Sequence, residues 1–283
     1  MQDNGMLLDY SEVYDNITSF IADFAKNITT DTKFVIGISG GIDSALCAAL
    51  AVRSVGSNAV RGIYMPSSAN SEDSERLSYE LCENLDIKLD VVDIGGMQNA
   101  FRENFELSTE VKLGSTALGN ISARLRMITV MAMSNELGGV VVNTGNLTEK
   151  ILGYYTLYGD GAGAIAPIAS LLKTDVWNLS RFINDCATSP SASNPIPPEI
   201  IDRAPSAELI ASQTDEEDIG ESYADMDRCI VEYFNADFNE SLIKSNTLAK
   251  SIYDRYISNK FKISSNIKYP AVRMDQERFL EKL

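Results

Sequence analysis

Hydrophobic residues recur along the first half of the chain with two alternating spacings. Residues 13–24 repeat apolar side chains three or four positions apart, which is the spacing of one helix face. Short apolar runs follow, and each run is separated from the next by a stretch with helical spacing. The runs predict strands at 33–38, 59–65, 88–94 and 140–143. The stretches between and around them predict helices at 43–54, 72–85 and 121–137.

Strands that alternate with helices indicate an α/β protein. Because crossover helices cover both faces of a parallel sheet, we expect a doubly wound parallel sheet with helices on both faces. Ligands of such sheets bind beyond the carboxyl ends of the strands. That edge would bring together three loops, at 39–44, 66–71 and 144–149.

The periodic pattern is lost in the second half of the chain, where Pro, Ser, Asn and acidic residues become frequent over 186–218. We interpret 186–218 as a long surface loop and as a candidate mobile lid. Helical spacing returns at 223–235 and 242–256, and 259–283 is expected to form a C-terminal tail. Neither an internal repeat nor a domain linker is visible, so a single domain over 1–283 is expected.

The composition excludes several classes of function. A net charge of −16 and a pI near 4.4 disfavour a nucleic-acid partner, since phosphate-driven binding needs a basic surface. The sequence has no histidine, which excludes a Ser-His-Asp triad and a His-ligated metal. Its four cysteines form no CxxC pair and are expected to be reduced. Neither a long apolar run nor a signal peptide is evident, so we expect a cytoplasmic protein without a membrane partner.

The sequence SGGIDS (39–44) separates a predicted strand from a predicted helix. A glycine pair permits backbone conformations closed to other residues, and successive amides at the start of a helix attract an anion. The hydroxyls of Ser39 and Ser44 add donors, and Asp43 can reach a divalent cation that shields phosphates. Neither GxxxxGK[ST] nor GxGxxG is present. A tight turn without a ligand is the alternative that these six residues alone leave open.

Together with later motifs, SGGIDS resembles a known family. It is similar to the pyrophosphate-binding signature of the N-type ATP pyrophosphatases, which split ATP between its α and β phosphates. The later motifs resemble NAD synthetase in order and spacing, from about Tyr10 to Lys268. They are NISARLR (120–126), TGNLTE (144–149), YTLYGDGAG (155–163), API (166–168), KT (173–174), NPIPPEI (194–200), RAPSAEL (203–209) and QTDE (213–216).

This resemblance implies an amide-forming ligase. Members of the family activate the nicotinate carboxylate of deamido-NAD with ATP and Mg²⁺, form an acyl-adenylate and release pyrophosphate. Ammonia then displaces AMP and gives NAD. A nucleophilic side chain is not required, which agrees with the absence of histidine and of paired cysteines. The family members are symmetric homodimers, so the resemblance implies a homodimer here, with the helix at 121–137 as a candidate interface element.

Details of the motifs are most similar to the synthetase domain of the glutamine-dependent enzymes. The compact ammonia-dependent bacterial enzymes more often have TKYGDGG followed by an aspartate. Leu157 and Ala164 occupy those lysine and aspartate positions here, so these two dinucleotide contacts cannot be carried over. Only a short segment precedes the SGGIDS loop, so we do not expect a glutaminase domain. Free ammonia, or ammonia from a separate glutaminase, is the expected nitrogen source.

The resemblance also implies roles for single residues. The residues implied to bind ATP are Gly37, Ile38, Ser39, Gly40, Gly41, Ile42, Asp43, Ser44, Thr144, Lys173 and Ser206. Asp43 and Lys173 would be the catalytic residues, and Asp43 and Glu149 would bind Mg²⁺. Contacts to deamido-NAD are implied for Asn120, Arg124, Glu149 and Lys268. Each has an ordinary alternative: a helix-start acid for Glu149, a surface ion pair for Arg124 and a tail lysine for Lys268.

Two other functions stay open at this point. A non-catalytic nucleotide-binding paralogue would account for the departures at Leu157 and Ala164, whereas the intact Asp43, Glu149 and Lys173 argue against it. The second is an ATP pyrophosphatase that amidates another carboxylate. Within that group, a tRNA thiolase is disfavoured by the acidic charge and the lack of paired cysteines. A GMP synthetase is disfavoured because TLYGD and APSAEL are typical of the NAD enzyme.

Overall fold

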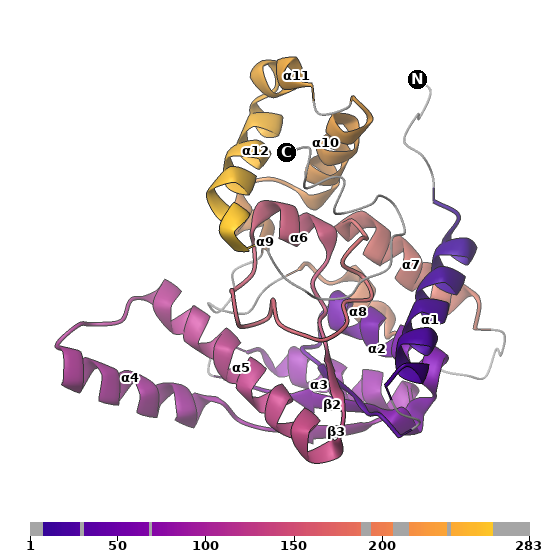
Figure 1. Ribbon diagram of the computed structural model, residues 1–283, viewed down its shortest axis with the longest axis vertical. Coiled ribbons are helices and arrows are strands. Elements are labelled where there is room, and N and C mark those ends of the chain that lie inside the picture. Colours follow the sequence, from indigo (N-terminus) through magenta and orange to yellow (C-terminus); the bar gives the residue numbers. More distant parts are fainter. Residues whose placement is uncertain are drawn as a thin grey trace.

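A parallel β-sheet lies at the centre of the computed structural model (Figure 1). The structure describes residues 8–28, 31–67, 70–187, 194–205, 215–236 and 239–262. Within these residues the sheet has four strands in the order β3-β2-β1-β4, and every neighbouring pair is parallel. Their bounds are β1 Phe34–Gly37, β2 Val60–Tyr64, β3 Lys88–Val91 and β4 Val140–Val142.

The central strand β1 is buried on both faces because its side chains alternate between two apolar layers. Phe34 and Ile36 belong to a large cluster on one face, whereas Val35 belongs to a smaller cluster on the other. All three residues are at most 1% exposed. This burial explains the continuous apolar run, which is typical of a strand in a parallel sheet covered on both sides.

Helices cover both faces, which confirms the predicted doubly wound α/β fold. Helices α1, α2, α3 and α7 contribute to the larger cluster, and α5 covers the opposite face with Val130. The bounds are α1 Tyr10–Lys26, α2 Ile42–Val55, α3 Glu72–Asn84, α5 Ser115–Leu137 and α7 Lys173–Asp185. A short 3₁₀ turn, η1 at Ser57–Ala59, leads into β2.

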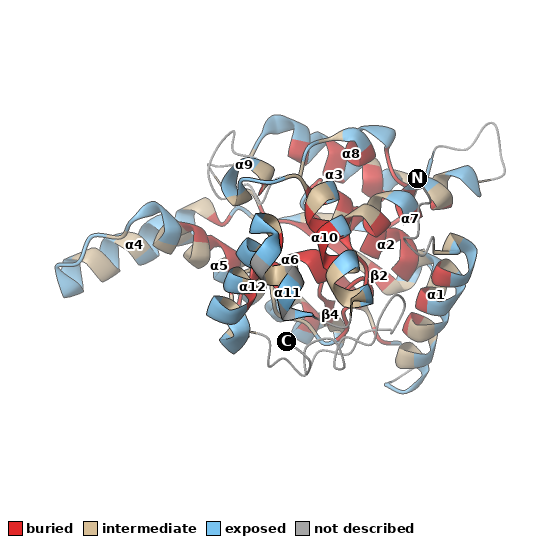
Figure 2. Ribbon diagram, turned by 90° about the horizontal axis from the view of Figure 1, so that it is seen from above, coloured by how far each residue is buried: buried red, intermediate tan, exposed pale blue. Residues whose placement is uncertain are grey.

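Helix α4, Gly95–Thr109, was not predicted, and none of its residues is buried. It runs beside the first part of α5, and the two helices project from the body as an arm (Figures 1 and 2). The exposed large apolar residues of the arm are Met97, Phe101, Leu107, Val111, Ile128 and Met131. Several exposed apolar side chains on two adjacent helices are a feature that can mark a contact with another protein.

A second group of helices packs on the carboxyl side of the sheet. Helix α6, Leu147–Leu152, follows β4 closely, and α10, Tyr223–Asn235, and α12, Thr247–Asn259, pack on α6 through Ile151, Ile230 and Ile252. The remaining elements are α8 Pro198–Asp202, α9 Asp215–Ile219, α11 Glu240–Ser245 and the 3₁₀ turn η2 Lys260–Lys262.

The predicted loop at 186–218 contains a segment that is packed into the core. Ile196, Ile200 and Ile201 around α8 are at most 6% exposed and join the large cluster. Residues 188–193 and 206–214 lie outside the described residues, and so does 263–283 of the predicted tail. The first part of that tail, 259–262, instead ends α12 and forms η2. Among the described helices, none has the length and apolar character needed to cross a membrane.

Candidate active site

The SGGIDS loop connects β1 to α2 at the carboxyl edge of the sheet. Gly40 has a φ of 78°, and a Cβ there would lie 2.6 Å from the carbonyl oxygen of Ser74 in α3, so only glycine fits. The Ser39 and Ser44 hydroxyl oxygens lie 3.2 Å apart. Gly41, the N-cap of α2, provides no side-chain cap. The first amides of a 14-residue helix therefore face this loop, as an anion site requires.

A lysine and two carboxylates meet directly beside this loop. Lys173, the first residue of α7, is 2% exposed, and its Nζ donates to Asp43 Oδ2 and, over 3.3 Å, to Glu149 Oε1. The predicted catalytic pair, 130 positions apart in the sequence, is thus in direct contact. The ring of Tyr223 lies against the same ammonium, with 5.2 Å between Nζ and the ring centroid.

Asn146 fixes the orientation of both carboxylates. Its Nδ2 donates to Asp43 Oδ1 over 3.0 Å, and its Oδ1 accepts from the backbone amide of Glu149 over 3.0 Å. Glu149 Oε2 accepts from the backbone amide of Asn146 in return, which completes a capping box at the start of α6. Glu149 therefore does act as a helix-start acid, which was the alternative to a metal-binding role. Its other oxygen, Oε1, accepts from Lys173.

Two carboxyl groups share one ammonium in this cluster, and one of them, Glu149, keeps its proton near neutral pH in the ligand-free protein. Burial raises the pKa of Glu149 to about 8; the Lys173 ammonium opposes that shift and the Asp43 carboxylate adds to it. Burial alone would lower the pKa of Lys173, but Asp43 and Glu149 outweigh it and raise that pKa. The two carboxyl groups therefore keep the Lys173 ammonium charged and could bind a second cation.

The donor set suits a magnesium ion. Asp43 and Glu149 offer hard carboxylate oxygens at one point, where they already share a cation, the ammonium of Lys173. Within the described residues, no group of three or more His, Cys, Asp or Glu side chains could hold a metal by itself. Magnesium is commonly bound by one or two carboxylates together with substrate phosphates, so two protein ligands fit this mode.

The YTLYGDGAG segment forms a loop that several distant residues hold in place. Asn143, at the end of β4, donates through Nδ2 to the carbonyl oxygens of Asp160 and Ala162, at 2.8 and 3.1 Å. Asn120 Oδ1 accepts from the Thr156 hydroxyl at 2.7 Å. Arg124, which is exposed, donates through Nε to the carbonyl oxygen of Leu157 at 3.3 Å. The two predicted substrate residues on α5 thus lie against this loop.

Thr144 follows β4 at the same edge of the sheet, next to Asn143. It is partly exposed and precedes Asn146 and Glu149 of the charged cluster by two and five positions. Ser206 and Lys268, which were predicted to contact ATP and deamido-NAD, lie outside the described residues. Their roles stay predictions.

Lys262 is a lysine that the sequence did not single out. Its Nζ donates to the carbonyl oxygens of Gly153 and Tyr155, at 2.7 and 3.0 Å, and lies 5.4 Å from the centroid of the Tyr155 ring. Lys262 therefore fastens the end of α12 to the start of the YTLYGDGAG loop. No sequence signal pointed to it, because it falls in the predicted tail at 259–283, beyond the last predicted helix at 242–256.

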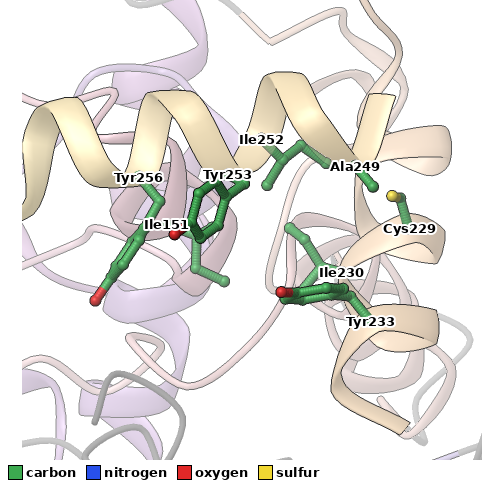
Figure 3. A pocket seen from close by; sticks show the side chains of 8 residues that line it. All are labelled: Ile151, Cys229, Ile230, Tyr233, Ala249, Ile252, Tyr253 and Tyr256. Atoms are coloured by element: carbon green, nitrogen blue, oxygen red, sulfur yellow. The ribbon is translucent and has the colours of Figure 1, made fainter. Parts of the chain in front are cut away.

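One small cavity shares α6 with the charged cluster but has a different character. Its lining residues, drawn in Figure 3, come from α6, α10 and α12. They are Ile151, Cys229, Ile230, Tyr233, Ala249, Ile252, Tyr253 and Tyr256. None of them carries a charge at neutral pH, so this cavity is not suited to a nucleotide phosphate.

Comparison with known families agrees with this geometry. A family model described as NAD synthase matches residues 13–266. The chain belongs to the NAD synthase family. Among curated family members, the NH(3)-dependent NAD(+) synthetase of Wolinella succinogenes is 36% identical over 234 residues, which cover 81% of this chain and 84% of that protein. The resemblance stated from the motifs is thereby confirmed.

Solved structures related to the NAD synthase family share the fold. An NMN synthetase from Francisella tularensis matches with a TM-score of 0.75 and 28% identity, over 93% of this chain and 99% of that one. A glutamine-dependent NAD+ synthetase from Acinetobacter baumannii matches with a TM-score of 0.65 over 96% of this chain and 50% of that one. Its 24% identity shows the fold alone. The NAD synthase match ends at residue 266, before Lys268 and after Lys262.

We expect Glu149→Gln to stabilise the ligand-free protein increasingly as the pH rises. Above 4.5, the ordinary pKa of a glutamate, the unfolded chain releases this proton, whereas the folded protein retains it up to about 8. Stability from this group is therefore lost as the pH rises through that window, by up to about 1.4 kcal/mol per pH unit. Glutamine keeps an acceptor for Asn146 and does not titrate.

Urea unfolding of both proteins in metal-free buffer, from about pH 5 to about pH 8, measures the difference. Glu232→Gln, at an exposed position on α10, is the control and should give a difference that is small and independent of pH. A constant difference for Glu149→Gln over the whole range would contradict the prediction.

Proposed function

We propose that this protein is an ammonia-dependent NAD synthetase. It would amidate deamido-NAD with ATP and ammonia and release NAD, AMP and pyrophosphate. The observation that carries the proposal is the contact of Lys173 with Asp43 and Glu149 beside the N-terminus of α2, in a chain of the NAD synthase family. The naming of its curated relative as NH(3)-dependent supports ammonia as the nitrogen source.

The residues of the cluster would act by positioning and by charge. The amides at the start of α2 and the hydroxyls of Ser39 and Ser44 would bind the ATP phosphates. Asp43 and Glu149 would hold Mg²⁺, which when bound neutralises phosphate charge. Lys173 would then direct its ammonium at the phosphates and stabilise the charge that develops as pyrophosphate leaves. The nicotinate carboxylate attacks the α-phosphorus, so no side chain has to act as a nucleophile.

The second substrate would bind on the side of the YTLYGDGAG loop. Asn120 and Arg124 contact this loop from α5, and Lys262 contacts it from the end of α12. Arg124 is exposed and positively charged, which suits a phosphate of the dinucleotide. We propose Lys262 as a further contact, because its ammonium already lies on Gly153 and Tyr155.

The reaction itself tests the proposal. Purified protein with ATP, Mg²⁺, ammonium and deamido-NAD should yield NAD, AMP and pyrophosphate in equal amounts, and glutamine should replace ammonium poorly. Asp43→Asn should remain folded and lose most activity, since it removes a carboxylate that is proposed to bind Mg²⁺ next to the ATP phosphates. Nicotinate mononucleotide is the alternative substrate to test, because the fold also matches that of an NMN synthetase. Faster turnover of that mononucleotide, or of an unrelated carboxylate, would overturn the assignment of the substrate.

Lys262 and Lys268 give a matched pair of variants for the substrate side. We expect Lys262→Ala to raise the KM for deamido-NAD about tenfold or more, because it removes a charged hydrogen-bond donor from the loop. The KM for ATP should change little. Steady-state kinetics of both variants measure this, with Lys268→Ala as the comparison. An effect confined to Lys268→Ala would show that Lys268, the residue implied by the family resemblance, contacts deamido-NAD and that Lys262 does not.

We further propose that the arm of α4 and α5 forms a homodimer interface. The arm exposes Phe101 at 47% and Met131 at 44%, and Phe101 stacks on Phe105. A second copy of the chain would cover these side chains next to the helix that carries Asn120 and Arg124. The wild type should then sediment as a dimer, and Phe101→Glu should shift it toward the monomer by burying a charge in the contact. Tyr79→Glu, at a position 50% exposed on α3, is the control and should remain dimeric.

A further inference from the structure

Helix α7 begins at Lys173 without a capping side chain at its N-cap position. The N-cap residue is Leu172, which has no acceptor in its side chain. The first amides of a helix have no partner within the helix, and they are costly when they are buried unpaired. Here the amide of Lys173 itself is one of these groups. The chain must therefore provide acceptors from elsewhere.

Asp227 of α10 provides the missing cap from a distant part of the chain. Its Oδ2 accepts from the backbone amide of Thr174 at 2.8 Å. Its Oδ1 accepts from the hydroxyl of Thr148 at 2.5 Å, and Thr148 Oγ1 in turn accepts from the backbone amide of Lys173 at 3.0 Å. The side chain of Asp227 is 2% exposed, and its negative charge suits the start of a helix.

The direction of these hydrogen bonds is determined. A carboxylate can only accept, so the single hydroxyl proton of Thr148 must go to Asp227. The Thr148 oxygen is then left as an acceptor for the amide of Lys173. Removing the hydroxyl therefore leaves the amide of Lys173 without its acceptor, and removing the carboxylate leaves the amide of Thr174 and the hydroxyl proton of Thr148 without theirs. The chain Asp227–Thr148–Lys173 has only this one arrangement.

The same contacts join α6 to α7. Thr148 precedes Glu149 in α6, and Lys173 is the first residue of α7. The hydrogen bonds from Asp227 through Thr148 to Lys173 therefore end at one partner of the Lys173–Glu149 ion pair and pass beside the other. Apolar packing keeps α10 in place: Ile230 lies with Ile151 of α6 and Ile252 of α12 around the cavity in Figure 3. Asp227 is thus carried by a helix that packs on α6 and α12 and whose first residue, Tyr223, lies against the Lys173 ammonium.

We propose that Asp227 is a positioning residue for Lys173: acting through Thr148 and the first turn of α7, it fixes where the lysine ammonium meets Asp43, Glu149 and the ATP phosphates. The inference rests on the proposed function, because the position of Lys173 is taken to matter for the rate of the amide-forming reaction. Asp227 touches no substrate. A shift of the first turn of α7 would move Lys173 Nζ relative to the reacting phosphorus, and displacements of about 1 Å can lower turnover about a hundredfold.

Asp227→Asn and Thr148→Val each break the chain with little change in volume. We expect each to lower kcat about tenfold to a hundredfold. The KM for deamido-NAD should stay within about twofold, because the YTLYGDGAG loop is untouched. The double variant should lose no more than the worse single variant, since both remove the same connection. Thr148→Ser keeps the hydroxyl and should retain near wild-type kcat.

A second measurement does not depend on turnover. The Nζ resonance of Lys173 in lysine labelled with nitrogen-15, assigned by its loss in Lys173→Arg, reports where the ammonium lies. It should shift in Asp227→Asn and in Thr148→Val, and keep its position in Thr148→Ser and in the surface control Glu232→Gln.

The outcomes separate this inference from the proposed function. Variants that melt at lower temperature but keep the wild-type kcat and the Lys173 resonance would reduce Asp227 to a structural cap and overturn the inference. Additive losses in the double variant would also overturn it. If the wild type makes no NAD, the proposed function fails, while a shifted resonance would still establish the positioning of Lys173. If Asp227→Asn does not fold, the Thr148→Val and Thr148→Ser pair decides.

Discussion

The buried ammonium of Lys173 is the feature on which the polar edge of this protein depends. A lysine that is 2% exposed is tolerated only if its charge is matched, and Asp43 and Glu149 match it from two other segments of the chain. Those acids cannot move apart without leaving the lysine unpaired. The loop between β1 and α2, the start of α6 and the start of α7 therefore hold one another in place.

The cluster has two carboxyl groups for one ammonium, and the second carboxyl group would serve a bound cation. A balanced pair would be stable and inert, whereas two carboxylates around one ammonium retain affinity for a further cation. ATP would bring both the anion for Lys173 and the metal for the carboxylates. An enzyme of the N-type needs no lysine inside its phosphate loop for this purpose. In the proposed reaction the positive charge would come from Lys173, far away in the sequence, and the loop would contribute amides and hydroxyls.

The second half of the site is organised by backbone contacts. The YTLYGDGAG loop is held by Asn143 from the sheet, by Asn120 and Arg124 from α5, and by Lys262 from α12. Most of these side chains bind carbonyl oxygens, so they shape the loop whatever residues it carries. Such a loop can accommodate Leu157 and Ala164, where the compact bacterial enzymes have charged residues, without losing its form.

Much of this arrangement could be predicted from the sequence, because it is local. Apolar runs and helical spacings are set by neighbours in the chain, so β1 to β4 and the helices α1, α2, α3, α5, α10 and α12 were expected near their observed positions, whereas α6 to α9 were not. The SGGIDS loop was recognisable because its conformation depends on its own glycines, and the motifs named Asp43, Glu149 and Lys173. Helix α4 was missed although Met97, Phe101 and Phe105 recur in it at helical spacing; none of its residues is buried in the core.

Only the tertiary structure decided which distant groups meet. Nothing near Asp227 in the sequence indicates that it caps a helix that begins more than fifty residues earlier. Lys262 looks like any lysine at a helix end, and Ile200 lies in a stretch whose composition predicts a surface loop. In each case the deciding term is the burial of a polar or apolar group by an element far away in the chain. That burial exists only once the sheet has brought its carboxyl edge and the later helices together.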